Sequence, residues 1–324
     1  MSSIDFCSIA PIPNLYIELD SPLNVKDIRL IPHLNDEQLK QQFSIELDIM
    51  NYVERENWVS SPIYVRNITV TGSAPGSEAE TAFQLASKQI EDFINTLILF
   101  KPSMTYLARG PFWVHQIVDG NVTGTGKGDF ATVPKFGPAE RYQLCKSEYL
   151  EFVKFYEIWN SYMSNNSKTN LDLSISNSYH WLTKARMNLM PYDRLIFLIT
   201  ALESLVGAGT ELTHRISHRT ATILGSDSVE RGKIYDRISE YYGQRSTLLH
   251  GSITDISNNM IFDLAEMVRA MILRFTSLSL NTYTITRKDL MEKLDRSVVD
   301  ETLRDTIIQI GNKSFGIHSN PQLV

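Results

Sequence analysis

The feature that most constrains this fold is a change in hydrophobic period near Pro138. Downstream of that residue the apolar side chains recur with the spacing of amphipathic helices, whereas upstream they alternate as in strands. Consecutive amphipathic helices bury their apolar stripes against one another, so a helical bundle is expected. The expected fold class is therefore an α+β N-terminal domain of residues 1–137, an all-α bundle of residues 138–312 and an irregular tail of residues 313–324.

The helices of the second part can be placed by their periodicity and their end residues. Pro191 opens one helix at a favoured first-turn position, and Gly207 and Gly225 close two others. Asp227 with Glu230 three residues later forms a capping box that starts another helix. The expected helices cover residues 139–164, 175–189, 191–206, 211–224, 228–250, 257–280, 287–296 and 298–310.

The first part predicts strands around one helix. Phe43–Met50 alternates apolar and polar residues, and Ile63–Val70 is rich in β-branched residues, so both segments are typical of strands. Ser77–Phe100 has a helical stripe that ends before a proline. Phe112–Val118 returns to strand character. We place the domain boundary at Lys135–Glu140.

The glycine-rich segment Gly120–Asp129 invites comparison with a phosphate-binding loop. Such a loop needs a glycine, then four residues, then Gly-Lys-Ser/Thr. Asn121 stands where the first glycine belongs, and Gly128 follows Lys127, so the motif fails at two positions. We interpret the segment as a mobile hairpin turn.

Composition excludes several classes of protein. Charged residues make up 21% and hydrophobic residues 43%, as in soluble globular proteins. The longest apolar runs fall short of the ~20 residues of a membrane span, and the N-terminus lacks the basic residues of a secretory signal. With only Cys7 and Cys145, neither a disulfide framework nor a cysteine metal site is expected. We expect a cytoplasmic protein that does not contact a membrane.

The net charge of -6 belongs entirely to the first part. Residues 1–137 contain 16 acidic and 10 basic side chains, whereas residues 138–324 contain 21 of each. Binding of nucleic acid depends on local patches as well as on total charge, and the segment His214–Arg219 is one such basic cluster. Charge therefore neither requires nor excludes RNA as a partner of the second part.

Two histidines and an arginine in the helix 211–224 need an interpretation. His214 and His218 are four residues apart, so they share one face, but no third ligand lies in register and the metal signal is weak. Both point away from the apolar stripe, which favours a solvated face. Arg219 falls within that stripe, which is unusual for a charged residue.

Two further charged residues occupy apolar surroundings in the sequence. The helix 192–206 is apolar on nearly all sides and carries Glu203 in its later turns, where an unpaired carboxylate would be costly. An arginine partner is therefore expected. Arg245 lies within the apolar stripe of the helix 228–250, so it faces either the core, with its head on a carboxylate, or an interface.

His250 follows Arg245 by five residues and precedes Gly251, which suits a helix C-cap. The helix dipole favours the protonated form of a histidine at this end, which makes His250 a candidate acid. On an ideal helix, residues five apart are separated by about 140°, so the two side chains do not share a face. Their convergence requires a loosened last turn, a long reach by Arg245, or two chains.

The segment from Tyr242 to Gly251 resembles the HEPN superfamily, whose nuclease members carry Arg, four to six residues, then His. Arg245 and His250 match that spacing, with Tyr242 before the arginine and the small polar Ser246 after it. By this resemblance, Ser246 would position the phosphate or the histidine.

Upstream segments extend the resemblance. Ala201–Leu205 and the helix Glu211–Arg219 are similar to two helices of the Apea-like HEPN branch, so the likeness covers residues 201–251, and the first part of the chain has no counterpart. Arg109 and His115 also fit the Arg/His spacing, but the Gly-Pro between them excludes the required helix.

The resemblance implies a bundle that forms a homodimer and cleaves RNA at its interface without a metal ion or other cofactor. Arg245 would stabilise charge on the scissile phosphate, and His250 would act as general acid or base while the ribose 2'-hydroxyl attacks. The products would carry 2',3'-cyclic phosphate and 5'-hydroxyl ends. Glu203 is a candidate ion-pair partner that holds Arg245, with Arg219 or Arg194 as alternative partners for Glu203.

Two functions follow from this resemblance. The first is a metal-independent endoribonuclease serving as a toxin or antiphage defence effector, with residues 1–137 as a sensor, regulator or substrate-selecting module. The second is a non-catalytic HEPN module that binds RNA, nucleotides or a partner protein, in which Arg245 and His250 are interface or structural residues. The sequence identifies neither the RNA target nor an antidote or activator.

Overall fold

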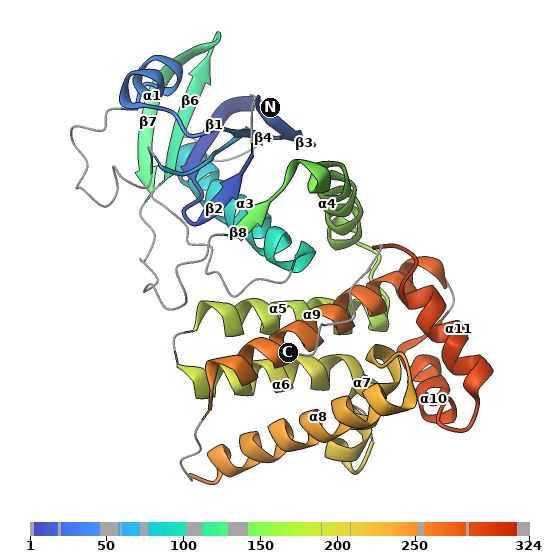
Figure 1. Ribbon diagram of the computed structural model, residues 1–324. Helices are drawn as coiled ribbons and strands as arrows, with labels where there is room; N and C mark the ends of the chain where they lie inside the picture. Colours follow the sequence, from blue (N-terminus) through green and yellow to red (C-terminus); the bar gives the residue numbers. More distant parts are fainter. Residues whose placement is uncertain are drawn as a thin grey trace. The chain divides into compact units, whose positions relative to one another are not determined.

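In the computed structural model the chain forms two compact units, Met1–Tyr162 and Met163–Val324 (Figure 1). The boundary expected at Lys135–Glu140 lies outside the described residues. The structure describes residues 3–18, 21–45, 58, 60–71, 77–101, 112–128, 142–188, 190–207, 209–251, 256–282 and 285–315. In this part of the chain, strands come first and a run of helices follows, as expected for an α+β part and a helical part.

The first unit is built on an antiparallel sheet. Among the described residues the strand order is β3-β4-β5-β1-β6-β7, and β1 pairs with both β5 and β6. A separate parallel pair joins β2 to β8. The strands are β1 (Ser3–Pro11), β2 (Leu15–Ile17), β3 (Leu23–Val25), β4 (Ile28–Ile31), β5 (Ile63–Thr71), β6 (Phe112–Val118), β7 (Asn121–Gly128) and β8 (Tyr142–Leu144). The helices of this unit are α1 (Asp36–Phe43), α3 (Glu78–Phe100) and α4 (Tyr149–Ser164), which follows a short 3-10 turn, Lys146–Glu148.

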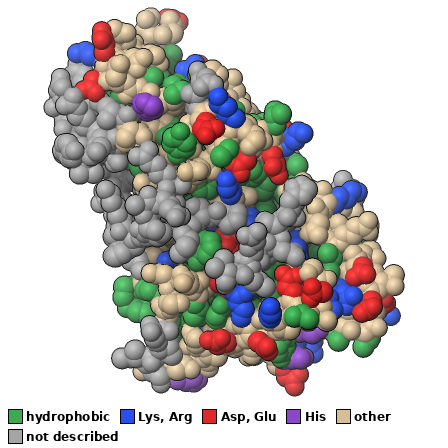
Figure 2. All heavy atoms as spheres, in the orientation of Figure 1, with side chains coloured by type: hydrophobic (Ala, Val, Ile, Leu, Met, Phe, Trp, Pro, Cys, Tyr) green, Lys and Arg blue, Asp and Glu red, His purple; other side chains and the backbone are tan. Residues whose placement is uncertain are grey.

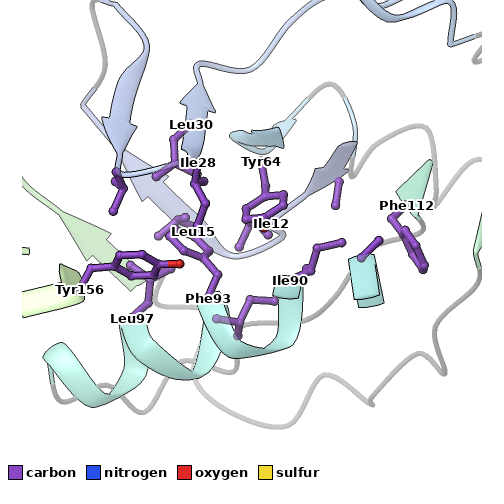
Figure 3. Packing of buried hydrophobic residues seen from close by; sticks show 14 of the residues in the cluster. Ile12, Leu15, Ile28, Leu30, Tyr64, Ile90, Phe93, Leu97, Phe112 and Tyr156 are labelled. Carbon is purple, nitrogen blue, oxygen red and sulfur yellow. The ribbon is translucent and has the colours of Figure 1, made fainter. Parts of the chain in front are cut away.

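One face of the sheet packs on α3. Side chains alternate along β1, so Phe6 belongs to the core on the α3 side while Ile9 belongs to a second core on the other face. Figure 3 shows Ile90, Phe93 and Leu97 of α3 pointing toward the strands. Helix α4 adds buried side chains to the same core, which places it with the sheet.

The second core lies on the opposite face. It contains Leu39 and Phe43 of α1 together with two tryptophans, Trp58 and Trp113. The indole rings of these tryptophans meet edge to face with their centroids 5.2 Å apart, an arrangement that aromatic rings favour. The sheet is therefore covered on both faces.

Three predicted elements of the first part are confirmed: β5, α3 and β6 occupy the expected segments. The strand expected over Phe43–Met50 is wrong at its start, because Phe43 is the last residue of α1, and residues 46–50 lie outside the described residues. Asn35 and Gln38 form a reciprocal capping box that starts α1, and Ser44 ends it with a φ of 53°. These local end signals override the alternation of apolar residues.

The glycine-rich segment is a strand rather than a turn. Only Asp119 and Gly120 form the turn, with φ values of 49° and 77°, as the preferred two-residue hairpin connection requires. Three glycines then alternate along β7, and two of them lie against aromatic rings. A Cβ at Gly126 would sit 2.3 Å from Phe83 Cζ, and one at Gly128 would sit 2.1 Å from Phe112 Cε1. Glycine at these two positions therefore allows the β7 backbone to pack directly against the Phe83 and Phe112 rings.

Replacement of Gly126 should destabilise the first unit. In Gly126→Ala the new methyl group must displace the Phe83 ring, so we expect the free energy of unfolding to fall by about 1–3 kcal/mol. Urea unfolding followed by tryptophan fluorescence would measure the change. Gly232→Ala is the control, because a Cβ there meets nothing within 4 Å, and a stability loss of equal size in both variants would contradict the prediction.

The second unit is helical throughout its described length apart from connecting segments. The helices are α5 (Asn170–Met187), α6 (Pro191–Val206), α7 (Leu212–Leu224), α8 (Ser228–Leu249), α9 (Asn258–Asn281), α10 (Arg287–Arg296) and α11 (Glu301–Gly311). Helix α9 is buried on all sides from Leu264 to Leu278 and packs against α5, α6, α7 and α11. It is therefore the central helix of the bundle.

Most helices of the second unit match their predicted segments, and the predicted bounds of α6 and α10 are identical to those observed. The helix expected over residues 139–164 is too long, because β8 and the 3-10 turn precede α4. Helix α5 begins earlier than expected, since Thr169 and Asp172 form a capping box at its start. Within the described residues, no helix combines the length and apolar character that crossing a membrane requires.

Candidate functional site

The sequence-predicted residues of α6 and α8 come together around one carboxylate. The Tyr242 hydroxyl donates a hydrogen bond to Glu203 Oε1 at 2.9 Å. Arg245 Nη2 lies 3.8 Å from Glu203 Oε2, and the Arg245 guanidinium carbon lies 5.5 Å from the centre of the Tyr242 ring. We call Glu203, Tyr242 and Arg245 the Glu203 cluster. The expected pairing of Glu203 with an arginine is confirmed, and the arginine is Arg245.

The Glu203 cluster is half-buried. About a quarter of each charged side chain is exposed, 24% for Glu203 and 23% for Arg245. The expectation that helix α6 is buried on nearly all sides is thus wrong along this stripe. Because 3.8 Å exceeds hydrogen-bonding distance, Arg245 interacts with Glu203 through charge alone. Its Nε is buried and has no hydrogen-bond partner among the described residues.

The surroundings of Tyr242 keep its hydroxyl protonated. Burial raises the pKa of Tyr242, and the hydrogen bond to Glu203 and the carboxylate charge raise it further, while the charge of Arg245 opposes them. A raised phenol pKa means that the hydroxyl keeps its proton at neutral pH. Tyr242 therefore acts as a hydrogen-bond donor to Glu203.

A second cluster of the same composition ties α8 to α9. Tyr241 donates a hydrogen bond to Asp263 Oδ2 at 2.7 Å, and Arg237 forms a close ion pair with Asp263 Oδ1. We call these residues the Asp263 cluster. Burial raises the pKa of Tyr241 to about 12, with a contribution from its hydrogen bond to Asp263. Helix α8 is thus attached on two sides by a tyrosine, a carboxylate and an arginine.

His250 lies at the exposed C-terminal end of α8. The helix ends at Leu249, and the His250 backbone N–H donates to Ser246 O at 3.2 Å. Gly251 follows with a φ of 82°, so the predicted C-cap glycine is confirmed. Within the described residues, no hydrogen bond of the His250 imidazole is found, either to Arg245 or to another group. No hydrogen bond within the described part of one chain therefore joins the two side chains.

Ser246 and Arg219 contribute less directly than the sequence suggested. Ser246 is half-buried, and its backbone carbonyl, not its hydroxyl, contacts His250. Arg219 is 2% exposed and forms two hydrogen bonds with Asp295, from Nε to Oδ1 at 2.8 Å and from Nη2 to Oδ2 at 2.9 Å. Its Nη1 donates to the Val206 carbonyl at 2.5 Å. Arg219 therefore holds the end of α6 and is not a partner of Glu203.

Two residues of α10 that contribute to the contacts at the end of α6 were not identified from the sequence. Asp295 accepts from Arg219 and also from Arg215 Nη1 at 2.9 Å, while Arg287 donates to the Gly207 carbonyl at 2.8 Å. Both residues belong to α10, far along the chain from α6 and α7. The position of Arg219 in an apolar stripe indicated that it needed a carboxylate, but no local pattern identifies which one.

The histidine pair of α7 behaves largely as expected. His214 is exposed and its Nδ1 lies 3.0 Å from the Tyr235 hydroxyl, while His218 is half-buried. Burial lowers the pKa of His218, and the neighbouring His214 lowers it further. Among the residues that the structure describes, no group of three or more His, Cys, Asp or Glu side chains is placed to hold a metal ion.

Comparisons of the chain with protein-family models, with curated proteins and with solved structures found no match.

Loss of the Asp295 carboxylate should destabilise the second unit in a pH-dependent way. The hydrogen bond from Arg219 lowers the pKa of Asp295, so this contribution is present above the unfolded-state pKa of about 3.9 and is lost as pH falls through the lower folded-state value. We expect Asp295→Asn to reduce the free energy of unfolding at pH 7 by roughly 1–3 kcal/mol, because a buried guanidinium loses its charged acceptor.

Urea unfolding of wild type and variant between pH 7 and pH 3 tests this expectation. The difference between them should begin to shrink below about pH 3.9, where the carboxyl of the unfolded state binds a proton while the folded-state carboxyl still resists protonation. Asp236→Asn on the exposed face of α8 is the matched control and should change little. A difference that is constant over this range would contradict the assigned role of the Arg219–Asp295 pair.

Proposed function

We propose that this protein is a metal-independent endoribonuclease of the HEPN type, with Arg245 and His250 as its catalytic residues. The observation that carries the proposal is the state of Arg245: its guanidinium is partly exposed and forms no hydrogen bond among the described residues. An exposed imidazole, His250, lies farther along the same helix. A partly exposed cation and a titratable group on the same segment of chain are the group types that suit a phosphodiester.

In the proposed reaction the ribose 2'-oxygen attacks phosphorus while the bond from phosphorus to the 5'-oxygen breaks. Arg245 stabilises the negative charge that develops on the nonbridging oxygens. One proton leaves the 2'-hydroxyl and one is delivered to the departing 5'-oxygen, and His250 serves as the base or the acid. The products carry a 2',3'-cyclic phosphate and a 5'-hydroxyl.

Convergence of the two catalytic residues is proposed to occur between two copies of the chain. Along α8, positions 245 and 250 are separated by about 7.5 Å and by about 140° around the axis. The exposed side of the helix includes Gly232 and Gly243, where a Cβ would meet nothing within 4 Å. Leu249 beside His250 is 57% exposed. Small residues and an exposed leucine permit close approach of a second helix, which supports a homodimer.

One observation favours the second function, a non-catalytic HEPN module that binds RNA, nucleotides or a protein. Arg245 has the same kinds of neighbour as Arg237, a tyrosine and a carboxylate, and the ion pair of Arg237 joins α8 to α9. On the face in Figure 2, the side chains of the second unit include acidic and basic groups side by side. In this alternative, Arg245→Ala lowers thermal stability and RNA remains intact.

Cleavage of RNA in EDTA tests the proposed nuclease. We expect wild type to cut a labelled mixed RNA pool and leave cyclic-phosphate ends, and Arg245→Ala and His250→Ala to be slower by roughly 100-fold or more, since each removes a group that acts on the transition state. Arg237→Ala and His214→Ala are the matched controls. Equal activity in all five proteins would exclude Arg245 and His250 as the catalytic pair.

Mixing the two inactive variants tests whether the site is shared between chains. If Arg245 of one chain acts with His250 of the other, a mixed dimer contains one intact site, so about a quarter of wild-type activity should return after random exchange. The recovered rate is measured after the subunits are dissociated and reassociated together. If both residues act within one chain, no activity returns, and the proposed shared site is wrong.

A further inference from the structure

The two clusters on α8 have the same chemical groups but different distances. In the Asp263 cluster, each carboxylate oxygen has its own close partner, Tyr241 on one and Arg237 on the other. In the Glu203 cluster, the Tyr242 hydroxyl donates to Oε1 at 2.9 Å, whereas Arg245 Nη2 lies 3.8 Å from Oε2. The exposed fractions of the two arginines are similar, 25% and 23%. Exposure therefore does not explain why only one arginine is fully paired.

Tyr242 makes two contacts, and the second has no counterpart between Tyr241 and Arg237 among the described residues. Its hydroxyl fixes the Glu203 carboxylate, and its ring lies under the Arg245 guanidinium, with 5.5 Å between the ring centre and Cζ. A cation over an aromatic face is attracted to the ring, so the ring supports the guanidinium without using its N–H donors. One tyrosine thus contacts both charged groups, and its ring contact is the feature that distinguishes the Glu203 cluster from the Asp263 cluster.

We propose that Tyr242 is a positioning residue that keeps Glu203 from closing onto Arg245 and so leaves the guanidinium donors open for an RNA phosphate. This inference rests on the proposed function in that it names the ligand as a phosphate. Arginine and carboxylate otherwise form a two-point, charge-assisted pair, which would compete with phosphate for the same donors. In this arrangement Glu203 balances the charge of Arg245 without accepting hydrogen bonds from its N–H donors.

Removal of the Tyr242 hydroxyl separates this role from simple packing. Tyr242→Phe keeps the ring under Arg245 and releases Glu203, which is then free to form the two-point pair. We expect reaction of Arg245 with phenylglyoxal, followed by peptide mass spectrometry, to slow about fivefold, because a paired guanidinium is covered. We expect affinity for a labelled single-stranded RNA to weaken on the order of tenfold for the same reason.

A second substitution provides the rescue. Glu203→Gln removes the charge that closes onto Arg245, so Tyr242→Phe/Glu203→Gln should regain wild-type phenylglyoxal reactivity and RNA affinity. A tyrosine that only supports the fold would not be rescued by this change. Tyr241→Phe is the matched control on the neighbouring cluster and should leave the reactivity of Arg245 unchanged.

The outcomes distinguish this inference from the proposed function. Unchanged phenylglyoxal reactivity of Arg245 in Tyr242→Phe overturns the positioning role, whatever the RNA measurements give. The expected reactivity pattern without RNA cleavage by wild type supports the positioning role and counts against the nuclease. If Tyr242→Phe fails to fold, the phenylglyoxal reactivity of Arg245 in Glu203→Gln decides: an unchanged rate supports the proposal, because the donors are already open, and a severalfold gain overturns it, because Glu203 would then cover Arg245 in the wild type.

Discussion

The C-terminal end of α6 is the point on which the geometry of the candidate site depends. The last carbonyls of a helix lack partners within the helix and carry partial negative charge, so cationic donors stabilise them. Arg219 donates to the Val206 carbonyl and Arg287 to the Gly207 carbonyl. Asp295 balances the buried charge of Arg219 and connects α7 to α10. Glu203 lies one turn before this end, and its carbonyl accepts from the Gly207 N–H at 2.9 Å, so its backbone belongs to the turn of α6 that Arg219 and Arg287 hold.

The same kind of contact closes other helices of the second unit. Arg274 of α9 donates to the Ile223 carbonyl near the end of α7, and burial lowers the pKa of its guanidinium to about 10. Ser277, also from α9, donates to the Ile310 carbonyl of α11 at 2.7 Å. The central helix therefore satisfies the backbone ends of two neighbours through side chains that are themselves buried. Substitution of Arg274 or Ser277 in α9 is therefore expected to perturb the C-terminal ends of α7 and α11.

The elements that the sequence predicts well are those whose ends are determined locally. Pro191 and Gly207 mark both ends of α6, and the predicted range of that helix equals the observed one. The start of the strand predicted over Phe43–Met50 shows the limit of alternation, because a capping box eight residues earlier starts a helix that includes Phe43. The periodicity of apolar residues indicates which face of an element is buried. It does not report capping side chains, which bind backbone N–H donors directly and so determine where a helix starts.

The candidate site also contains one contact that the sequence could predict and others that it could not. The need of Glu203 for an arginine could be predicted, since an apolar helix makes an unpaired carboxylate costly. The partner of Arg219 could not be predicted, because Asp295 is 76 residues away and only the packing of α10 on α7 brings the two together. The hydrogen bond of Tyr242 depends on how α6 and α8 are aligned, which no spacing within either helix determines.

Comparison of Arg237 with Arg245, both on α8, indicates how one helix can have a fully paired and an incompletely paired cation. Arg237 and Tyr241 use Asp263 completely, and this attaches α8 to α9 about two turns before Arg245. Because that contact already anchors the helix, Arg245 is not required to do so, and it lies 3.8 Å from Glu203 without a hydrogen bond to it. The buried Nε of Arg245 has no partner among the described residues, but the same is true of Arg287 and Arg304, so the separation from Glu203, and not the unpaired Nε, distinguishes Arg245.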